Sequence, residues 1–261
     1  MAKLVPFILL LLLLFAENNP VSAKPEMTES IQDEKPTFVI VHGAWGGSWA
    51  FKEVESLLRE KGYDVYRPSL TGQGERVHLA HPDIDLSIHI EDVVNVFLFE
   101  ELENVILVGH SYGGMVITGV ADRVSSRIRS MIYLDAFVPG NGESLFSMQG
   151  EGSNGMQQME QDGFIVPPWV NVNQPPPTDV PHPAKTLSER LELQNEDEIR
   201  AIPTVYIHAV EAGQNPEDDG FAAQADRARY HGWPVVIIES DHNPQWSAPE
   251  RLVDLLHKNW Q

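Results

Sequence analysis

The chain has 261 residues, of which 42% are hydrophobic and 21% charged, a composition typical of one ordinary globular domain and unlike that of a disordered or fibrous chain. Its formal net charge is −20, from 38 acidic and 18 basic residues. Such an acidic chain argues against binding to nucleic acid or to an anionic membrane, because both need a basic face. Cysteine is absent, so no disulfide stabilises the fold and no redox compartment is indicated.

The first 23 residues have the build of a secretory signal peptide. Lys3 gives a short basic start, an apolar run continues to about Ala16, and residues 21–23 form a small-x-small cleavage site. The run is short for a bilayer span, and an uncleaved anchor is the alternative. We expect a cleaved leader, a polar spacer at 24–35, export to the periplasm or the medium, and no stable membrane insertion of the mature chain.

From residue 36 onward, short apolar runs alternate with segments of helical periodicity. The apolar runs predict strands, at 37–45, 63–70, 104–109, 128–140, 202–210 and 234–240. The periodic segments predict helices, at 49–61, 84–102, 112–124, 221–233 and 248–260. Strands that are almost continuously apolar and alternate with helices indicate an α/β fold, in which helices cover both faces of a mostly parallel sheet.

The alternation stops between about residues 140 and 197, so we expect one domain over 36–261 with an insertion there. This segment is rich in Gly, Pro, Gln and Met, and its 166–183 stretch is too dense in proline for a helix or a central strand. Its apolar side chains need something to pack on; they are Phe164, Val166, Trp169 and Val170. The segment is therefore interpreted as a short lid over a site, with a mobile surface loop as the alternative.

Ser111 stands in the sequence Gly109-His110-Ser111-Tyr112-Gly113, directly after a predicted buried strand and before a predicted helix. A serine at a turn is often only a turn former. In this strand–turn–helix context, however, Gly-x-Ser-x-Gly is typical of a nucleophile on a tight turn, where glycines remove side chains that would collide. Ser111 is therefore the candidate nucleophile.

A serine nucleophile needs a base, and His242 is the best placed of ten histidines. It follows the last predicted strand, at the carboxyl edge of the sheet where ligands and catalytic groups collect. His208 is interpreted as a core or cap residue, and His182 in the lid as a candidate for substrate contact. Structural or solvated roles are expected for the rest, which are His42, His78, His81, His89, His110, His231 and His257.

The chain resembles the α/β-hydrolases, and within them the small esterase group related to plant methyl esterases and hydroxynitrile lyases. The stretches that carry the resemblance are VHGAWGGSW, GHSYGGMV, IYLDAFVPG and GWPVVIIESDHNP. The resemblance implies the α/β-hydrolase fold and an oxyanion hole formed by the backbone N–H groups of Ala44 and Tyr112. Trp45 and Trp49 are expected to pack at the entrance or in the core.

The acid of the expected triad is where the sequence departs from the family pattern. Most members hold it after the next-to-last strand, where this chain has Ala212, with Glu211 adjacent and Asp218 and Asp219 in an expected solvated turn. Asp135 directly follows an apolar strand and faces the same sheet edge as Ser111. We favour Asp135 and keep Glu211 as the alternative.

These residues predict a carboxylesterase-type serine hydrolase for small to medium apolar esters, with lactones open to the same chemistry. Neither a metal nor an organic cofactor is expected, and the oligomeric state stays open. A ligand-binding receptor on a hydrolase fold is the first alternative. A cyanohydrin lyase is the second, and it is disfavoured because Asn243 stands where the related lyases place a lysine beside the histidine.

Overall fold

The computed structural model describes residues 35–171 and 173–259, so the expected leader and most of the spacer lie outside the described residues. Its centre is a six-stranded sheet with strand order β2-β1-β3-β4-β8-β9, in which every neighbouring pair is parallel. The strands are β1 Thr37–Val41, β2 Val65–Tyr66, β3 Val105–His110, β4 Ile128–Leu134, β8 Thr204–Val210 and β9 Val235–Glu239. The predicted parallel α/β sheet is confirmed.

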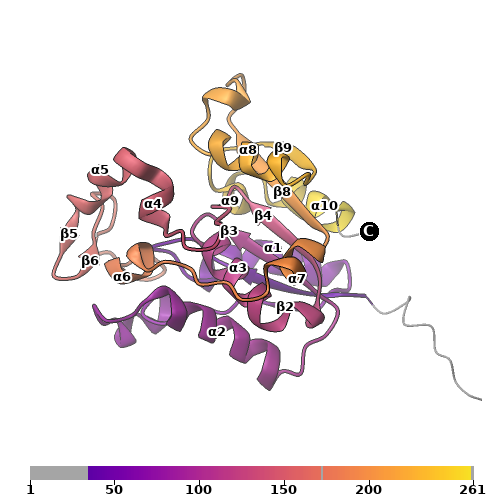
Figure 1. The fold of residues 1–261 in the computed structure, drawn as a ribbon, viewed down its shortest axis with the longest axis horizontal. Helices are drawn as coiled ribbons and strands as arrows, with labels where there is room; N and C mark the ends of the chain where they lie inside the picture. Colours follow the sequence, from indigo (N-terminus) through magenta and orange to yellow (C-terminus); the bar gives the residue numbers. More distant parts are fainter. Residues whose placement is uncertain (1–34, 172, 260–261) are drawn as a thin grey trace, which may run out of the picture. The chain divides into compact units, whose positions relative to one another are not determined.

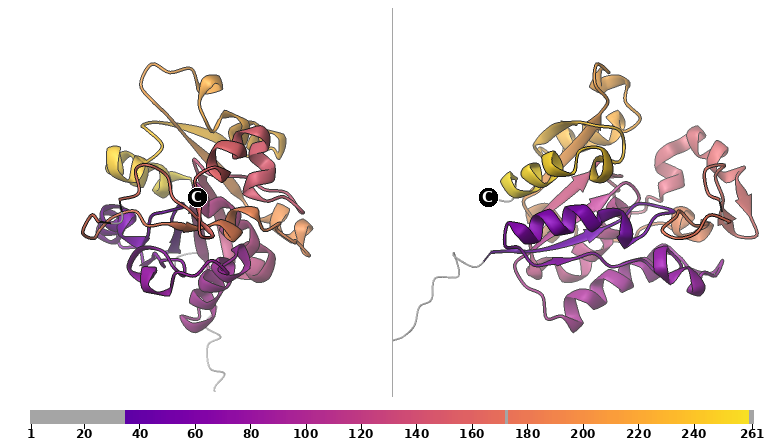
Figure 2. Two further views of the ribbon diagram at one scale, coloured as in Figure 1. Left: turned by 90° about the vertical axis from the view of Figure 1, so that its left-hand side faces the viewer. Right: turned by 180° about the vertical axis from the view of Figure 1, so that it is seen from behind.

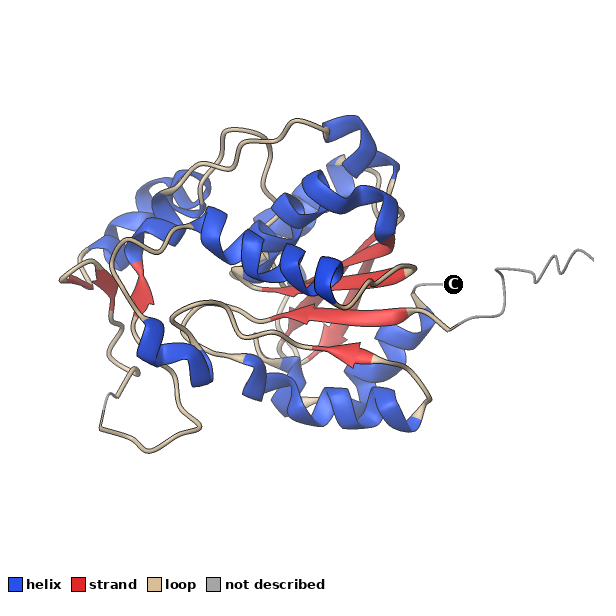
Figure 3. Cartoon of the chain, turned by 90° about the horizontal axis from the view of Figure 1, so that it is seen from below, coloured by secondary structure: helices blue, strands red, loops and turns tan. Residues whose placement is uncertain are grey.

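Helices cover both faces of this sheet (Figure 3). The helices of the α/β framework are α1 Lys52–Glu60, α2 Leu86–Phe99, α3 Gly113–Val124, α7 Glu196–Ala201, α8 Ala222–Tyr230, α9 Pro244–Ser247 and α10 Pro249–Lys258. Alternate residues of β1 point to opposite faces: Phe38 and Ile40 pack in the cluster that includes α1 and α10, and Val39 and Val41 in the cluster that includes α2 and α3. Figure 2 shows α1 and α10 side by side.

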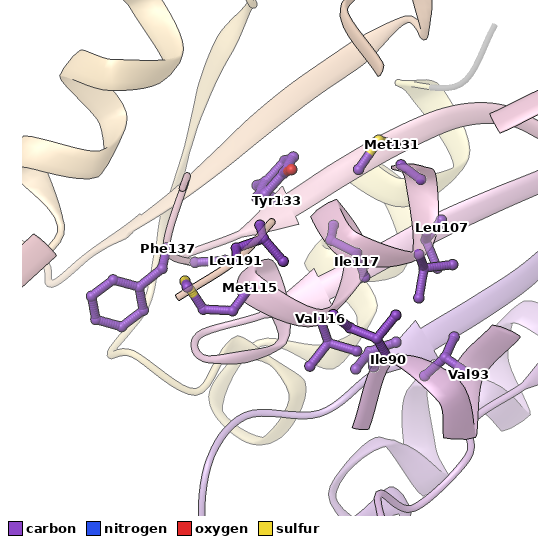
Figure 4. Packing of buried hydrophobic residues seen from close by; sticks show 14 of the residues in the cluster. Ile90, Val93, Leu107, Met115, Val116, Ile117, Met131, Tyr133, Phe137 and Leu191 are labelled. Atoms are coloured by element: carbon purple, nitrogen blue, oxygen red, sulfur yellow. The ribbon is translucent and has the colours of Figure 1, made fainter. Parts of the chain in front are cut away.

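The larger core cluster lies between the sheet and the pair α2 and α3. Ile90 and Val93 of α2 lie beside Val116 of α3 (Figure 4), and all three are buried. Val116 and Met115 follow directly on the Gly-x-Ser-x-Gly turn, so this packing fixes the start of α3 against the sheet. The core thereby holds the turn that carries Ser111.

The predicted strand over 128–140 is too long, because β4 ends at Leu134. Asp135 has a φ of 43°, which breaks the extended conformation although Ala136, Phe137 and Val138 remain buried. Apolar sequence alone therefore did not mark the end of this strand. Asp135 directly follows the strand, as its position behind the apolar run indicated.

The expected insertion contains short elements of its own, gathered at one side of the central sheet (Figure 1). They are α4 Leu145–Gln149, α5 Ser153–Gln157, β5 Glu160–Gln161, β6 Phe164–Ile165, β7 His182–Pro183 and α6 Ala184–Ser188. The three strands form a small antiparallel sheet in the order β5-β6-β7. Pro183 lies in an edge strand, where its missing N–H is tolerated.

The insertion is attached to the core through Trp45, which follows β1. Its carbonyl accepts from the N–H of Val180 at 2.8 Å, and its indole N–H donates to the carbonyl of Ile165 at 3.0 Å. Within the described ranges, no helix is both long and apolar enough to cross a membrane.

Candidate active site

The turn after β3 holds Ser111 in a left-handed backbone conformation, with φ of 54°. This is an uncommon region for a residue with a side chain, and it aims the serine away from the sheet. A Cβ on Gly113 would lie 2.6 Å from the carbonyl oxygen of Val41, and one on Gly114 would lie 2.1 Å from that of Phe137. The expectation that glycines clear space for this turn is confirmed.

Ser111 and Asp135 occupy equivalent places at the ends of two paired strands. His110 and Leu134 are partners in the register of β3 and β4, and each candidate follows one of them directly. The N–H of Ser111 donates to the carbonyl of Leu134 at 3.2 Å, and the Ser111 carbonyl accepts from the N–H of Phe137 at 3.1 Å. Backbone hydrogen bonds therefore fix the position of the serine relative to the aspartate.

His242 lies between these two side chains and is hydrogen-bonded to both. Its Nδ1 is 2.6 Å from Oδ2 of Asp135, and its Nε2 is 3.0 Å from Oγ of Ser111. With Asp135 ionised, Nδ1 carries the proton and Nε2 accepts from the serine hydroxyl. This is the arrangement in which an imidazole can take the serine proton.

Asp135 is buried behind the histidine, with 2% of its side chain exposed. Burial raises the pKa of Asp135 above its usual value, while the hydrogen bond from His242 acts in the opposite direction. Its second oxygen accepts from the N–H of Ala209 at 3.1 Å, so both carboxylate oxygens have a donor. Glu211, the alternative acid, is exposed and makes no hydrogen bond to His242 in the described part of the chain.

Two further histidines beside the serine are buried and neutral at ordinary pH. Burial lowers the pKa of His42 to about 4 and that of His110 to about 3. The His42 Nε2 accepts from the N–H of Leu70 at 3.1 Å, and His110 Nε2 donates to the carbonyl of His242 at 2.9 Å. The expected structural role of both residues is therefore confirmed, and His110 positions the backbone of His242.

The expected oxyanion donors lie on either side of the serine. A Cβ on Gly43 would be 3.0 Å from Cβ of Ser111, which places the Gly43–Ala44 backbone against the serine. Tyr112 follows Ser111 and precedes α3. Over the described ranges, neither the N–H of Ala44 nor that of Tyr112 has a protein acceptor. Both donors are available to a ligand oxygen.

The imidazole of His242 is in contact with two other rings. Phe221 lies at 4.6 Å between ring centroids with an interplanar angle of 13°, and His110 lies at 4.8 Å on a tilt of 36°. Phe221 is held in turn, because its N–H donates to Oδ1 of Asp219 at 2.7 Å. No sequence pattern predicted a role for Phe221, because its position beside His242 depends on the conformation of the loop after β8.

The expected solvated position of Asp219 is wrong. Its side chain is 17% exposed, and Nε2 of the fully buried His208 donates to its Oδ1 at 3.0 Å. His208 is a core residue, as expected, and it draws the aspartate inward. The neighbouring Asp218 is exposed, as the sequence indicated.

Asp135, His208 and Asp219 also form the one group in the described residues whose ligand atoms lie close enough to hold a metal ion, all within 4.8 Å of one another. Asp135 accepts from His242 and from Ala209, and Asp219 accepts from His208 and from Phe221. Both carboxylates already have hydrogen-bond donors within the protein, so the group gives no support for a metal centre.

A cavity of about 340 Å³ opens in front of Ser111 and His242. The backbone of Gly43 and Ala44 forms part of its wall, and aromatic rings and polar side chains form the rest. The lining residues are His42, Gly43, Ala44, Trp45, Gly46, Ala50, Phe51, His110, Ser111, Trp169, Asp179, His242, Asn243, Gln245 and Trp246. The insertion supplies two of them, Trp169 and Asp179, which agrees with its interpretation as a lid.

His182 does not line this cavity, so its expected contact with substrate is not found. It is fully buried, and its ring nitrogens are hydrogen-bonded to Gln73 at 3.1 Å and to Thr186 at 2.8 Å. Trp45 lines the cavity wall, as expected, while Trp49 stacks on Trp246 at its edge at 5.5 Å.

Residues 38–255 match the model of the alpha/beta hydrolase family, and the chain belongs to that family. Its relatives include the carbendazim hydrolyzing esterase of Nocardioides sp. (strain SG-4G), which is 54% identical over 111 residues, or 42% of this chain and 46% of the relative. Methylesterase 1 of Arabidopsis thaliana is 25% identical over 257 residues, or 88% of this chain and 97% of the relative.

A solved structure gives a similar result. An extracellular alpha/beta-hydrolase from a Paenibacillus species, described as sharing structural and functional homology with tobacco salicylic acid binding protein 2, superposes with a TM-score of 0.73 at 25% identity. The match covers 86% of this chain and 99% of that protein. The chain spans about half the length of several of the curated relatives it matches.

Proposed function

We propose that this chain is a serine hydrolase that cleaves carboxylic esters through an acyl-enzyme on Ser111. The observation that carries the proposal is the hydrogen-bonded series from Asp135 through His242 to Ser111, which opens onto a cavity beside two unpaired backbone N–H groups. Relatives named as esterases support the same class of reaction.

In the first half of the reaction, His242 takes the hydroxyl proton as Oγ of Ser111 attacks the ester carbonyl carbon. The N–H groups of Ala44 and Tyr112 bind the oxyanion of the tetrahedral intermediate, and each such donor is worth about 3 to 4 kcal/mol in the transition state. The carbon–oxygen bond to the alcohol then breaks, and Nε2 of His242 gives the proton to the departing alcohol.

In the second half, water replaces the alcohol. His242 takes a proton from water as the water oxygen attacks the acyl carbon, and Ser111 leaves with that proton as the acid product is released. Asp135 stays ionised throughout and stabilises the imidazolium of His242 at Nδ1. Because burial lowers the pKa values of His42 and His110, neither adds a competing positive charge beside the serine.

The cavity sets the size of substrate. A volume of about 340 Å³ is at the small end of ligand pockets and suits a small to medium ester or lactone with an apolar or aromatic group. The lining residues include no Lys or Arg, and Asn243 stands beside His242, so no cation is present to hold cyanide. This favours hydrolysis over cyanohydrin cleavage.

Hydrolysis of short- and medium-chain p-nitrophenyl esters tests the proposal. We expect activity in the mature chain, loss of about 10³-fold or more in Ser111→Ala, and no change in the control Ser188→Ala, whose exposed serine lies outside the cavity. An inactive wild type that is stabilised by a hydrophobic ligand would instead favour the receptor function.

We also propose that residues 1–23 direct export, on the strength of their sequence pattern alone. Cell fractionation and the mass of the exported chain test this. Export with a new N-terminus at Lys24 is the expected result, and a full-length chain retained in the cytoplasm would contradict it.

A further inference from the structure

One part of the cavity wall combines aromatic faces with a single acid. Trp45 and Trp169 meet edge to face at 5.6 Å between centroids, and the ring of Trp246 is supported by Trp49. Asp179 is the only carboxylate among the residues that line the cavity. The mechanism proposed above does not use it.

Asp179 is fixed in this place by its neighbour. The N–H of Val180 donates to the carbonyl of Trp45 at 2.8 Å, so the chain beside Asp179 is hydrogen-bonded to the segment that follows β1. The same segment carries the N–H of Ala44, one of the two expected oxyanion donors. The position of Asp179 is therefore fixed relative to the backbone that carries the Ala44 N–H.

The Asp179 carboxylate has no partner among the residues that the structure describes. Within residues 35–171 and 173–259, no hydrogen bond or salt bridge to its side-chain oxygens is found. The residue is about half buried, and burial raises its pKa above the usual value. Burying a carboxylate without a hydrogen-bond donor costs free energy, and a ligand that supplies the donor recovers that free energy on binding.

Among the described residues that line the cavity, the basic side chains are the histidines His42, His110 and His242. The lining contains no Lys or Arg, and burial keeps His42 and His110 neutral at ordinary pH. Anionic substrates are therefore disfavoured. Aromatic faces beside an unpaired acid suit a flat or cationic nitrogen group, because the rings attract cations and the carboxylate accepts from N–H.

We propose that Asp179 is a specificity-determining residue that binds an N–H group, either a protonated amine or a heteroaromatic N–H, on the non-reacting part of the substrate. This inference rests on the proposed function, because it takes the substrate to be an ester. The contact of Asp179 with the ligand is made at the cavity wall and not at the reacting carbonyl, so it selects substrates without taking part in bond cleavage.

Two matched pairs of esters test the inference. Methyl 4-(aminomethyl)benzoate is compared with methyl 4-ethylbenzoate, which has the same shape without the charge. Methyl indole-5-carboxylate is compared with its N-methyl derivative, which has lost the N–H. The first pair tests a protonated amine and the second a neutral heteroaromatic donor.

The readout is the ratio of kcat/KM within each pair. We expect the wild type to prefer the N–H member of at least one pair, and Asp179→Asn to lower that preference about tenfold or more, with part of it kept in Asp179→Glu. The control Asp162→Asn removes an exposed carboxylate from the same insertion and should keep the wild-type ratio. An unchanged ratio in Asp179→Asn, or an equal loss in the control, would overturn the inference.

A binding measurement separates this inference from the proposed function. Calorimetry of benzylamine, indole and 1-methylindole with the Ser111→Ala variant requires no turnover. We expect benzylamine or indole to bind, and the added Asp179→Asn substitution to weaken that binding about tenfold. If no ester is hydrolysed, ester hydrolysis fails and this binding result alone decides the role of Asp179; equal affinities with and without the substitution would refute it.

Discussion

The ends of β4 and β8 are neighbours in the sheet, yet they contribute to the site in different ways. At the end of β4, Asp135 is buried, and Leu134 and Phe137 on either side of it make backbone hydrogen bonds to Ser111. Gly114 lies too close to the Phe137 carbonyl to admit a Cβ. The loop after β8 is mostly exposed, and a Cβ on Gly213 or Gly220 would meet nothing within 4 Å. The aspartate that is hydrogen-bonded to His242 lies where packing is tight, and the loop after β8 supplies the ring that stacks on His242.

The largest expected difference between the two regions is in catalysis. Asp135→Asn should lower kcat by about 10³- to 10⁴-fold, because an amide at this position no longer stabilises the imidazolium or fixes the proton on Nδ1. Glu211→Gln, the matched change after β8, should leave kcat unchanged. Esterase assays of both variants measure this, and a larger loss in Glu211→Gln would exchange the two assignments.

The second largest expected difference between the end of β4 and the loop after β8 is in the free energy of unfolding. Gly114→Ala places a methyl group 2.1 Å from the Phe137 carbonyl oxygen, and we expect a loss of roughly 1–3 kcal/mol in the free energy of unfolding. Gly220→Ala meets open space and should change it by less than about 0.5 kcal/mol. Denaturant unfolding followed by circular dichroism provides the comparison. Equal midpoints for the two variants would show that the β4 end is not tightly packed.

His110, the partner of Leu134 at the end of β4, should add to the acid sensitivity of folding. Burial lowers the pKa of His110 to about 3, so between pH 6.5 and 3 the unfolded chain binds a proton that the folded chain does not. Stability is therefore lost as the pH falls, by about 1.4 kcal/mol per pH unit from this residue. Unfolding from pH 7 to 4.5 should show a smaller slope in His110→Gln, and the wild-type slope in His78→Gln, whose histidine is exposed. Equal slopes in all three proteins would contradict this.

The smallest expected effect belongs to the loop after β8. Phe221→Leu removes the ring stacked on His242 and should lower kcat by about threefold to tenfold, because the imidazole is then held less firmly between Ser111 and Asp135. Phe221→Tyr keeps the ring and should restore kcat in an esterase assay. An equal loss in both variants would mean that Phe221 serves only to pack the loop.

The sequence predicted most of the framework because apolar runs and helical periodicity are local signals. The strand–turn–helix around Ser111 was recognisable for the same reason. The choice between Asp135 and Glu211 depends on the order and register of β4 and β8, which no local pattern contains. Asp219 was misplaced because the buried His208 that draws it inward is eleven residues away in the chain.

The positions of side chains in the insertion could not be predicted from the sequence either. The proline content of this segment excluded long regular elements, but the place of Asp179 depends on two hydrogen bonds between the insertion and Trp45, one from the Val180 N–H and one to the Ile165 carbonyl. Those contacts join residues more than a hundred positions apart. A partly buried acid in such a segment has no sequence signal of its own.

The pairing of β3 with β4 has a consequence for how the protein can change. The serine and the aspartate hydrogen-bonded to His242 both belong to one strand pair, joined through the register of His110 and Leu134. In the proposed mechanism the loop after β8 does not carry the acid, so residues 211–218, which precede the Asp219 that binds His208 and Phe221, can vary in length and sequence. New substrate preferences can evolve, or be engineered, by grafting loops at this position while the spacing between nucleophile and acid stays constant.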